Sequence, residues 1–310
     1  MAGLALGLHG GCGTLERSLM SEAEWAEARA HIDAALRAGW RVLIAGGAAV
    51  DAVEATVVAL EDSPHFNAGH GAALTSEGTH ELDASIMDGA TLKAGAVAGV
   101  RRVRNPVRAA RAVMDSGLAV MMGGEAADAF AAARGLAMVD PSYFTTQRRI
   151  DALASLKRKA ASGQLLRASE AEKHGTVGAV ARDVAGRLAA ATSTGGFNNK
   201  PVGRIGDSPV VGAGVYAADG VCAVSCTGQG EIFIRCVAAH ELAARIRYKG
   251  ESLEQASRDV VHDLVGGFGI GAGMIALGPT GDPVAPFNTL GMYRGWITTA
   301  GDMSVATHHE

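Results

Sequence analysis

Hydrophobic positions recur with a helical period along much of this chain and give way to strand-like runs at its centre. The predicted helices cover residues 22–45, 49–60, 106–116, 125–134, 146–161, 231–248 and 252–264. The predicted strands cover residues 4–8, 94–100, 177–182, 188–192, 210–217, 220–226, 274–277 and 284–286, with another within 79–89. Helices on both sides of a central group of strands favour sheet packed on sheet, with helices on both outer faces. We therefore predict an α+β fold, a four-layer αββα sandwich.

Capping signals support two of the predicted helix starts. Ser21, followed three residues later by Glu24, forms the capping box that commonly opens a helix. Asn105 before Pro106 combines an N-cap side chain with a residue whose fixed φ suits the first helical turn. Both helices are therefore expected to begin at defined residues.

The composition is that of a globular chain without a basic face. Of the 310 residues, 48% are hydrophobic, and no Pro-rich or Ser-rich break divides the chain, so we expect one domain. Lys and Arg number 28 against 32 Asp and Glu, a net charge of −4, which argues against nucleic acid as a partner. The first eight residues lack the positive start of a signal peptide, and no apolar run reaches membrane-spanning length. We expect a small-molecule partner, no membrane contact and a cytoplasmic location.

The cysteines and glycines restrict the kinds of site that this chain can form. The four cysteines, Cys12, Cys222, Cys226 and Cys236, are too few and too unevenly spaced for a disulfide framework or a zinc site. Cys222 and Cys226 share one face of a predicted strand and are expected to be buried thiols. The 42 glycines gather in short motifs, which indicates tight turns and sites lined by backbone.

One peptide bond, between Gly175 and Thr176, lies where a polar segment meets a buried strand. Residues 162–173 are polar and predict a loop, whereas Thr176 opens the apolar run 177–182. Gly175 lets a hydroxyl approach its carbonyl closely, and the β-branch of Thr176 limits the directions of its Oγ1. If this bond were cleaved, Thr176 would carry both a hydroxyl nucleophile and an α-amine with a pKa of ~8. Alone, the threonine is better explained as an ordinary strand residue, and only its context favours a catalytic role.

Glycine-flanked motifs elsewhere favour the catalytic interpretation. In chain order they are HGGCG (9–13), FNAGHGA (66–72), HELDASIMDG (80–89), HGTVGAVA (174–181), TSTGG (192–196), GRIGDSP (203–209), TGQGE (227–231) and FNTLGMYRG (287–295). Together they resemble the plant-type asparaginase and isoaspartyl peptidase family of N-terminal nucleophile (Ntn) hydrolases. The resemblance implies the Ntn-hydrolase form of the αββα sandwich. It also implies self-cleavage between Gly175 and Thr176 into an α subunit, residues 1–175, and a β subunit, residues 176–310, which remain associated.

The resemblance assigns the chemistry to a few side chains. Mature Thr176 would attack the side-chain amide of L-asparagine or of a β-aspartyl peptide, with Thr194 hydrogen-bonded beside it. Thr227 and Gly228 would form the oxyanion hole and contact the substrate. Asn67 would brace the active-site region. No cofactor is implied for catalysis.

Substrate selection would depend on one pair of opposite charges. Arg204 would bind the substrate's α-carboxylate, and Asp207 its α-ammonium group. Without the neighbouring motifs, this pair would be explained as a weak surface ion pair. Two positions depart from the family pattern, Phe197 in the segment after TSTGG and His70 in FNAGHGA; neither is expected to touch the chemistry directly.

The resemblance also implies a structural sodium ion and an (αβ)2 assembly. The ion would be coordinated by backbone carbonyls, for which a hard cation is suited. By position these are the carbonyls of Leu60, Glu61, Ser63, Phe66, Ala68 and His70.

Other functions fit parts of the sequence. A glycosylasparaginase-like amidase would share the fold, but its nucleophile segment typically has aspartate before the threonine, where this chain has Gly175. An α/β-hydrolase would explain HGG at His9 but requires a G-x-S-x-G elbow, which is missing. The glycine run 266–273 lacks the following helix of a dinucleotide site. A non-cleaving binding scaffold would leave the Thr176 amine blocked. The tail 308–310 is expected to be frayed rather than a metal site.

Overall fold

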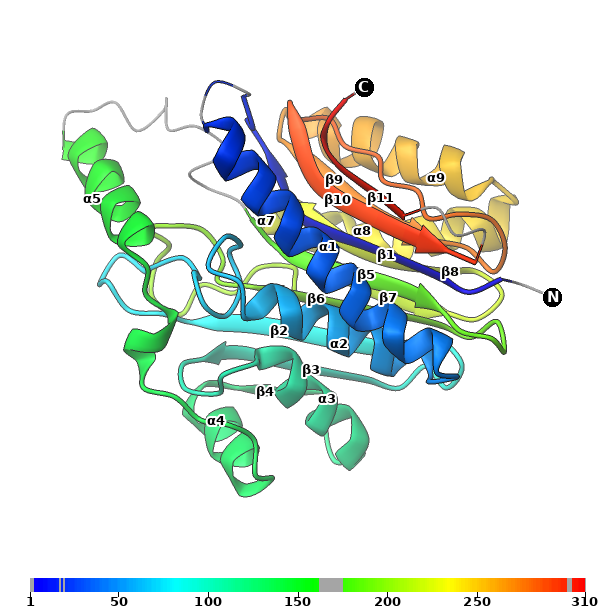
Figure 1. Cartoon of the computed structure of the whole chain (residues 1–310), viewed down its shortest axis with the longest axis horizontal. Helices are drawn as coiled ribbons and strands as arrows, with labels where there is room; N and C mark the ends of the chain where they lie inside the picture. Colours follow the sequence, from blue (N-terminus) through cyan, green and yellow to red (C-terminus); the bar gives the residue numbers. More distant parts are fainter. Residues whose placement is uncertain (1–2, 17, 19, 162–174, 300–302, 310) are drawn as a thin grey trace.

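A computed structural model describes residues 3–16, 18, 20–161, 175–299 and 303–309, which form two packed β-sheets between layers of helices (Figure 1). The larger sheet contains β1 (Ala5–Gly13), β2 (Leu82–Asp88), β3 (Ala94–Val100), β4 (Met121–Gly123), β5 (Val177–Arg182), β6 (Leu188–Thr194), β10 (Gly291–Thr298) and β11 (Met303–His308). The smaller sheet contains β7 (Val215–Ala218), β8 (Cys222–Gly228) and β9 (Ala272–Leu277). The strand orders are β11-β10-β1-β5-β6-β2-β3-β4 and β7-β8-β9.

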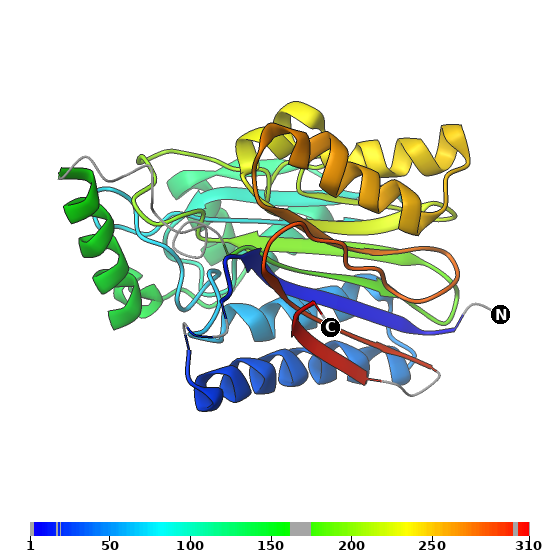
Figure 2. The same ribbon diagram turned by 90° about the horizontal axis from the view of Figure 1, so that it is seen from above.

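Helices cover the outer face of each sheet. They are α1 (Glu22–Ile44), α2 (Ala49–Glu61), α3 (Pro106–Ser116), α4 (Gly124–Ala133), α7 (Gly230–Cys236), α8 (Ala238–Ala244) and α9 (Leu253–Asp259). A further helix, α5 (Gln147–Ala161), lies beyond the end of the sheets and covers neither face (Figure 1). Figure 2 shows the blue helices of the N-terminal region on one side of the strands and the yellow and orange helices on the other. Short 3-10 and π segments lie at Pro141–Phe144, Arg245–Lys249, Val260–Val265 and Gly266–Phe268.

Three apolar clusters separate the four layers. The first joins α1, α2 and α3 to the larger sheet, and Ala179 of β5 points into it. The second fills the space between the sheets, where Val180 of β5 and Ile275 of β9 meet. The third joins the smaller sheet to its helices and contains both Cys222 and Cys226, which share one face as predicted. The predicted αββα sandwich is confirmed.

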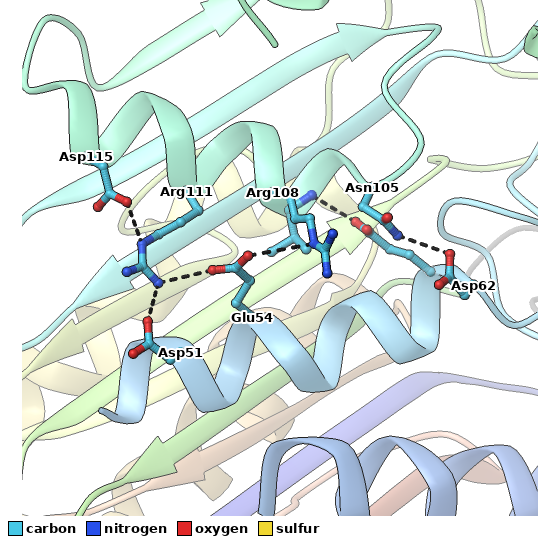
Figure 3. Close-up of polar contacts among 9 residues, drawn as sticks. Asp51, Glu54, Asp62, Asn105, Arg108, Arg111 and Asp115 are labelled. Carbon is cyan, nitrogen blue, oxygen red and sulfur yellow. Dashed lines mark hydrogen bonds and ion pairs between the residues drawn. The ribbon is translucent and has the colours of Figure 1, made fainter. Parts of the chain in front are cut away.

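The end of α2 is fixed to the start of α3 by a network of polar contacts (Figure 3). Asn105 precedes α3, but its side chain does not cap the helix as predicted; it donates to Asp62 Oδ1 at 3.2 Å. The buried carboxylate of Glu61 replaces it, accepting from the backbone N–H of Val107 at 3.0 Å. Arg111 extends the network to carboxylates on both helices. These contacts position the loop that follows α2. The capping box of α1 forms as predicted.

Several predicted boundaries were wrong. The turn expected at residues 9–13 is part of β1, which continues through the glycines past an irregularity between His9 and Cys12. The helix expected at 231–248 is interrupted at Val237, whose φ of 49° is left-handed. Residues 210–214, expected as strand, form turns and one isolated bridge before β7.

The C-terminal region is more ordered than the sequence indicated. β10 and β11 were not predicted, nor was the short β4. The tail is not frayed at His308, because this residue belongs to β11 and its Nε2 lies 2.6 Å from the carbonyl oxygen of Leu15. Glu310 and the predicted loop 162–173 lie outside the described residues.

The larger sheet contains strands from both before and after residue 175, and three of its pairings join one group to the other. β1 lies between β5 and β10, with antiparallel pairing on both edges. β6 in turn pairs with β2. The two parts of the chain are therefore joined along three strand pairings.

Candidate active site

Thr176 lies directly before β5, in the middle of the larger sheet. β5 is paired with β1 on one edge and with β6 on the other, so its start is held rigidly. Thr176 is only 7% exposed. Its Oγ1 donates a hydrogen bond to Thr194 Oγ1, 3.2 Å away at the end of β6. The hydroxyl predicted to be the nucleophile is thus oriented by the residue predicted to lie beside it.

A narrow pocket opens beside Thr176. Its lining residues are Thr176, Thr194, Gly196, Phe197, Arg204, Asp207, Ser208 and Gly228. They come from the ends of β5, β6 and β8 and from the loop between β6 and β7. The fold therefore brings the predicted nucleophile, the predicted charged pair and part of the predicted oxyanion hole to one space.

The backbone around the Gly175–Thr176 bond is crowded. Gly11 of β1 has a φ of 101°, and a Cβ on it would lie 2.8 Å from Gly175 Cα. A Cβ on Gly175 would lie 2.8 Å from Asn67 Cβ. Since neither glycine could carry a side chain without displacing its neighbours, Gly175 is held between β1 and the loop that carries Asn67.

Asn67 contacts this region with both ends of its buried amide. Its Nδ2 donates to Gly196 O at 2.5 Å, and its Oδ1 accepts from Ala73 N at 2.7 Å. Its backbone carbonyl accepts from Gly195 N at 2.9 Å. Asn67 therefore joins the loop after α2 to the glycine turn after β6, where Thr194 ends its strand.

Arg204 and Asp207 occupy the charged end of the pocket and are not a surface ion pair. Arg204 Nε donates to Glu231 Oε1 at 2.9 Å, and the guanidinium carbon lies 4.7 Å from the centroid of the Phe197 ring. Asp207 is 4% exposed, and its Oδ2 has no hydrogen-bond partner among the described residues. Burial raises the pKa of Asp207 to about 7. Phe197, expected to be remote from the chemistry, instead supports Arg204.

The two residues predicted to form the oxyanion hole lie at the end of β8. Thr227 is fully buried, and its Oγ1 has no hydrogen-bond partner among the described residues. Gly228 lines the pocket with a φ of 153°. A Cβ on Gly228 would lie 2.7 Å from the Phe233 ring, so glycine is required for the close packing here. A buried hydroxyl without a partner is free to bond a ligand.

Several residues that had no predicted role support the site from behind. Glu231, the partner of Arg204, is the last residue of the TGQGE motif but was given no role. His9 Nε2 lies 2.9 Å from Ser225 Oγ, which also contacts Thr192 Oγ1 at 2.7 Å. Burial lowers the pKa of His9 to about 3, although a hydrogen bond with the Thr176 backbone opposes the shift. A neutral imidazole therefore lies against the backbone of Thr176.

The last two residues of α2 and the loop that follows it carry the six carbonyls predicted to bind sodium. Glu61 O accepts from His70 N at 2.7 Å, and Leu60 O accepts from Ser63 N at 3.2 Å. A Cβ on Gly71 would lie 2.9 Å from Phe66 O, so the loop is tightly wound. Because each carbonyl oxygen has a second lone pair, these groups remain suited to a hard cation.

Comparison with known proteins covers almost the whole chain. A family model described as asparaginase matches residues 2–307. An isoaspartyl peptidase of Escherichia coli (strain K12) is 49% identical over 304 residues, which span 96% of this chain and 93% of that protein. A probable isoaspartyl peptidase/L-asparaginase 2 of Arabidopsis thaliana is 39% identical over 99% of both chains. An isoaspartyl peptidase/L-asparaginase of Homo sapiens is 42% identical over 82% of this chain and 81% of that protein. Within the described part of this chain, no helix is both long and apolar enough to span a membrane.

Proposed function

The chain belongs to the asparaginase family, and from this premise we propose that it hydrolyses L-asparagine to L-aspartate and ammonia and removes N-terminal β-aspartyl residues from peptides. Its membership confirms the prediction of an amide hydrolase. The names of the E. coli and human relatives support this pair of substrates. The observation that carries the proposal is the single pocket that Thr176, Arg204 and Asp207 line together. The charged pair can bind the carboxylate and ammonium groups of an amino acid, and Thr176 can attack the amide of its side chain.

Self-cleavage is the first step of the proposed mechanism. Thr176 Oγ1 attacks the carbonyl carbon of Gly175, the C–N bond between the two residues breaks, and the hydroxyl proton passes to the departing nitrogen. Water then hydrolyses the resulting ester, which restores the hydroxyl and leaves Gly175 with a carboxylate. The products are residues 1–175 and 176–310. The contacts of Gly175 with Gly11 and Asn67 support this step because they fix the position of the bond.

In turnover, the freed α-amine of Thr176, with an ordinary pKa of ~8, accepts the proton of Oγ1 as this oxygen attacks the substrate amide. Thr227 Oγ1 and Gly228 N–H stabilise the negative charge that forms on the carbonyl oxygen. The amine then gives the proton to the leaving ammonia or peptide amine, and water hydrolyses the acyl-enzyme. Thr194 keeps the nucleophile oriented.

The head group of the substrate is proposed to bind at the charged end of the pocket. Arg204 would take the α-carboxylate, since Glu231 and the Phe197 ring already hold its guanidinium. Asp207 would take the α-ammonium group with the oxygen that has no partner among the described residues. L-asparagine and a β-aspartyl peptide share this head group and differ only in the leaving amine.

Intact-mass spectrometry under denaturing conditions tests the proposal. We expect two masses, for residues 1–175 and 176–310, together with ammonia release from L-asparagine. Thr176→Ala should abolish both because it removes the hydroxyl, while Thr176→Ser should retain both at lower rates. Hydrolysis by the alanine variant would exclude Thr176 as the nucleophile. A single full-length mass without activity would indicate the non-cleaving scaffold.

The substrate pair requires its own measurement. Comparing kcat/KM for L-asparagine and for a β-aspartyl dipeptide establishes whether one pocket serves both. We expect both to be hydrolysed, with the same loss in Thr176→Ala. Hydrolysis of only one of them would restrict the proposed activity to that substrate.

We also propose that the carbonyls at the end of α2 and in the loop after it hold a sodium ion. Bound there, the ion would balance the partial negative charge of these carbonyl oxygens and stabilise the turn that leads to Asn67. Replacing sodium by tetramethylammonium at constant ionic strength should lower the melting temperature. An unchanged melting temperature would remove the ion from the proposal.

The assembly and the location complete the proposal. Two αβ units would form an (αβ)2 particle, so light scattering should give about twice the chain mass of 31.5 kDa. A mass of one unit would contradict it. Cys222 and Cys226 are buried and form no disulfide within the described part of the chain, which fits a reducing cytoplasm; cell fractionation would test this location.

A further inference from the structure

Outside the pocket, the side chains of Glu27, His31 and His65 meet on the surface between α1 and the loop after α2. Their metal-binding atoms, one carboxylate oxygen and two imidazole nitrogens, all lie within 4.8 Å of one another. From this cluster we infer a binding site for a divalent transition metal, best represented by Zn²⁺. The inference does not depend on the proposed function.

The three ligands come from two elements with fixed backbones. Glu27 and His31 are four residues apart in α1, so both project from one face of the helix. His65 faces them from the loop. Its backbone N–H donates to Ser63 Oγ at 3.3 Å, and its carbonyl accepts from Arg148 of α5 at 2.6 Å. The ligand contributed by the loop is thus held by contacts on both sides of its Cα.

The side chains already face one another. His65 Nε2 lies 3.3 Å from Glu27 Oε1, and the ring centroids of His65 and His31 lie 4.8 Å apart. An ion pair alone would use a single imidazole and would not explain the second beside it. Two imidazoles and one carboxylate are instead the donor set of a His2Glu zinc site, which a water molecule completes.

Only a small adjustment is needed to close the site around an ion. Zinc ligands lie ~2.0–2.2 Å from the metal, which places tetrahedral donor atoms roughly 3.4 Å apart. Glu27 can make this adjustment because its side chain is 62% exposed. Glu24 lies near enough to His65 to interact with it electrostatically and opposes the positive charge of Arg148. The surroundings therefore do not repel a cation strongly.

A metal at this position would join α1 to the segment that braces the active site. His65 is two residues before Asn67, and Phe66 between them packs edge-on against Tyr293 with ring centroids 5.8 Å apart. The expected role is structural: the ion would stabilise the folded loop.

Calorimetric titration of ZnCl2 into the purified full-length protein, stripped of metal and kept at constant NaCl, tests the inference. We expect one Zn²⁺ bound per chain with a dissociation constant in the micromolar range. Ca²⁺ and Mg²⁺ should not bind at this site, since they prefer oxygen ligands. His31→Ala should weaken Zn²⁺ binding at least tenfold, and Glu27→Gln, which preserves shape, should also weaken it.

Matched variants separate this site from other histidines. His262→Ala removes an exposed imidazole far along the chain and should leave Zn²⁺ affinity unchanged. His309→Ala removes an exposed imidazole near the C-terminus and should likewise leave Zn²⁺ affinity unchanged. Circular dichroism of each variant establishes that it is folded. Absence of Zn²⁺ binding, or binding that survives both His31→Ala and Glu27→Gln, would overturn the inference.

Discussion

Asp207 combines near-complete burial with a role that requires charge. Burial raises its pKa to about 7, Arg204 opposes the shift, and Glu231 and Asp83 add to it. Near neutral pH a substantial share of the free enzyme therefore carries a protonated Asp207. The ammonium group of a bound substrate would favour the ionised form, so substrate binding and loss of the proton are coupled.

This coupling predicts a pH dependence. For L-asparagine, kcat/KM should fall as the pH decreases through about 7, because the protonated carboxyl no longer attracts the substrate ammonium. Asp207→Asn should lower kcat/KM by about 100-fold at pH ~8, because a charge-assisted hydrogen bond is lost. It should also make the acidic limb less steep, leaving only the fall that protonation of the Thr176 α-amine causes. Initial rates measured from acidic to alkaline pH check both expectations.

The stability of the same variant provides the control. The folded pKa of Asp207 lies above its ordinary value of 3.8, so ionisation destabilises the folded protein as the pH rises from about 4 to about 7. Asp207→Asn should therefore gain melting temperature relative to the parent over that interval while losing activity. If Asp207→Asn lost melting temperature as well as activity, Asp207 would have a structural role instead.

Arg204 supports a separate prediction about binding. Arg204→Ala should raise KM by about 100-fold or more, because a bidentate contact with a carboxylate is lost. Self-cleavage should remain intact, since Arg204 contacts Glu231 and Phe197 and has no role in the proposed cleavage step. Arg204→Lys keeps the charge but not the two-pronged geometry and should recover only part of the loss. An unchanged KM in the alanine variant would remove Arg204 from the binding site.

The resemblance of the glycine-flanked motifs to a known family predicted five of the residues that line the pocket: Thr176, Thr194, Arg204, Asp207 and Gly228. The supporting contacts could not be predicted, since they depend on distances between remote segments. Nothing in the sequence places His9 against Ser225, 216 residues later, or Phe197 beneath Arg204.

At the scale of elements, close packing of α3 on β3 depends on Gly95. A Cβ there would lie 2.0 Å from Ala110 O and 2.5 Å from Met114 N. Gly95→Ala should therefore displace the helix and destabilise the protein by about 1–3 kcal/mol, the usual cost of overpacking. The midpoint of urea unfolding measures this change. Gly267→Ala is the matched control, because a Cβ there meets no atom within 4 Å; equal midpoints for the two variants would contradict the argument.

Hydrophobic periodicity predicted the elements best where one face alone is buried. α3 occurs at the predicted bounds, since its apolar positions repeat cleanly. The pattern failed where backbone conformation decides, as at Val237, whose left-handed φ breaks a continuous helical pattern. It also failed for β10, where residues on both sides are partly exposed and the period is obscured.

At the scale of the whole molecule, the order of strands determines whether the two chains stay together once the precursor is cut. β1 is bonded along both edges to strands that come after residue 175, and β2 is bonded to β6. After cleavage at Gly175, the two chains should therefore remain together in native conditions and separate only in denaturant. Size-exclusion chromatography before and after urea treatment measures this, and separate elution of the chains in native buffer would contradict it.

The same strand order has a consequence for how the protein is made. A chain of residues 1–175 synthesised alone would leave both edges of β1 without partners, and such edges promote aggregation. A precursor that folds before it is cut never exposes them, because both halves are delivered to the sheet by one covalent chain. If the chain is cut as proposed, folding should therefore come before the cut. Expressing the two halves from separate genes should give insoluble chains rather than a working enzyme.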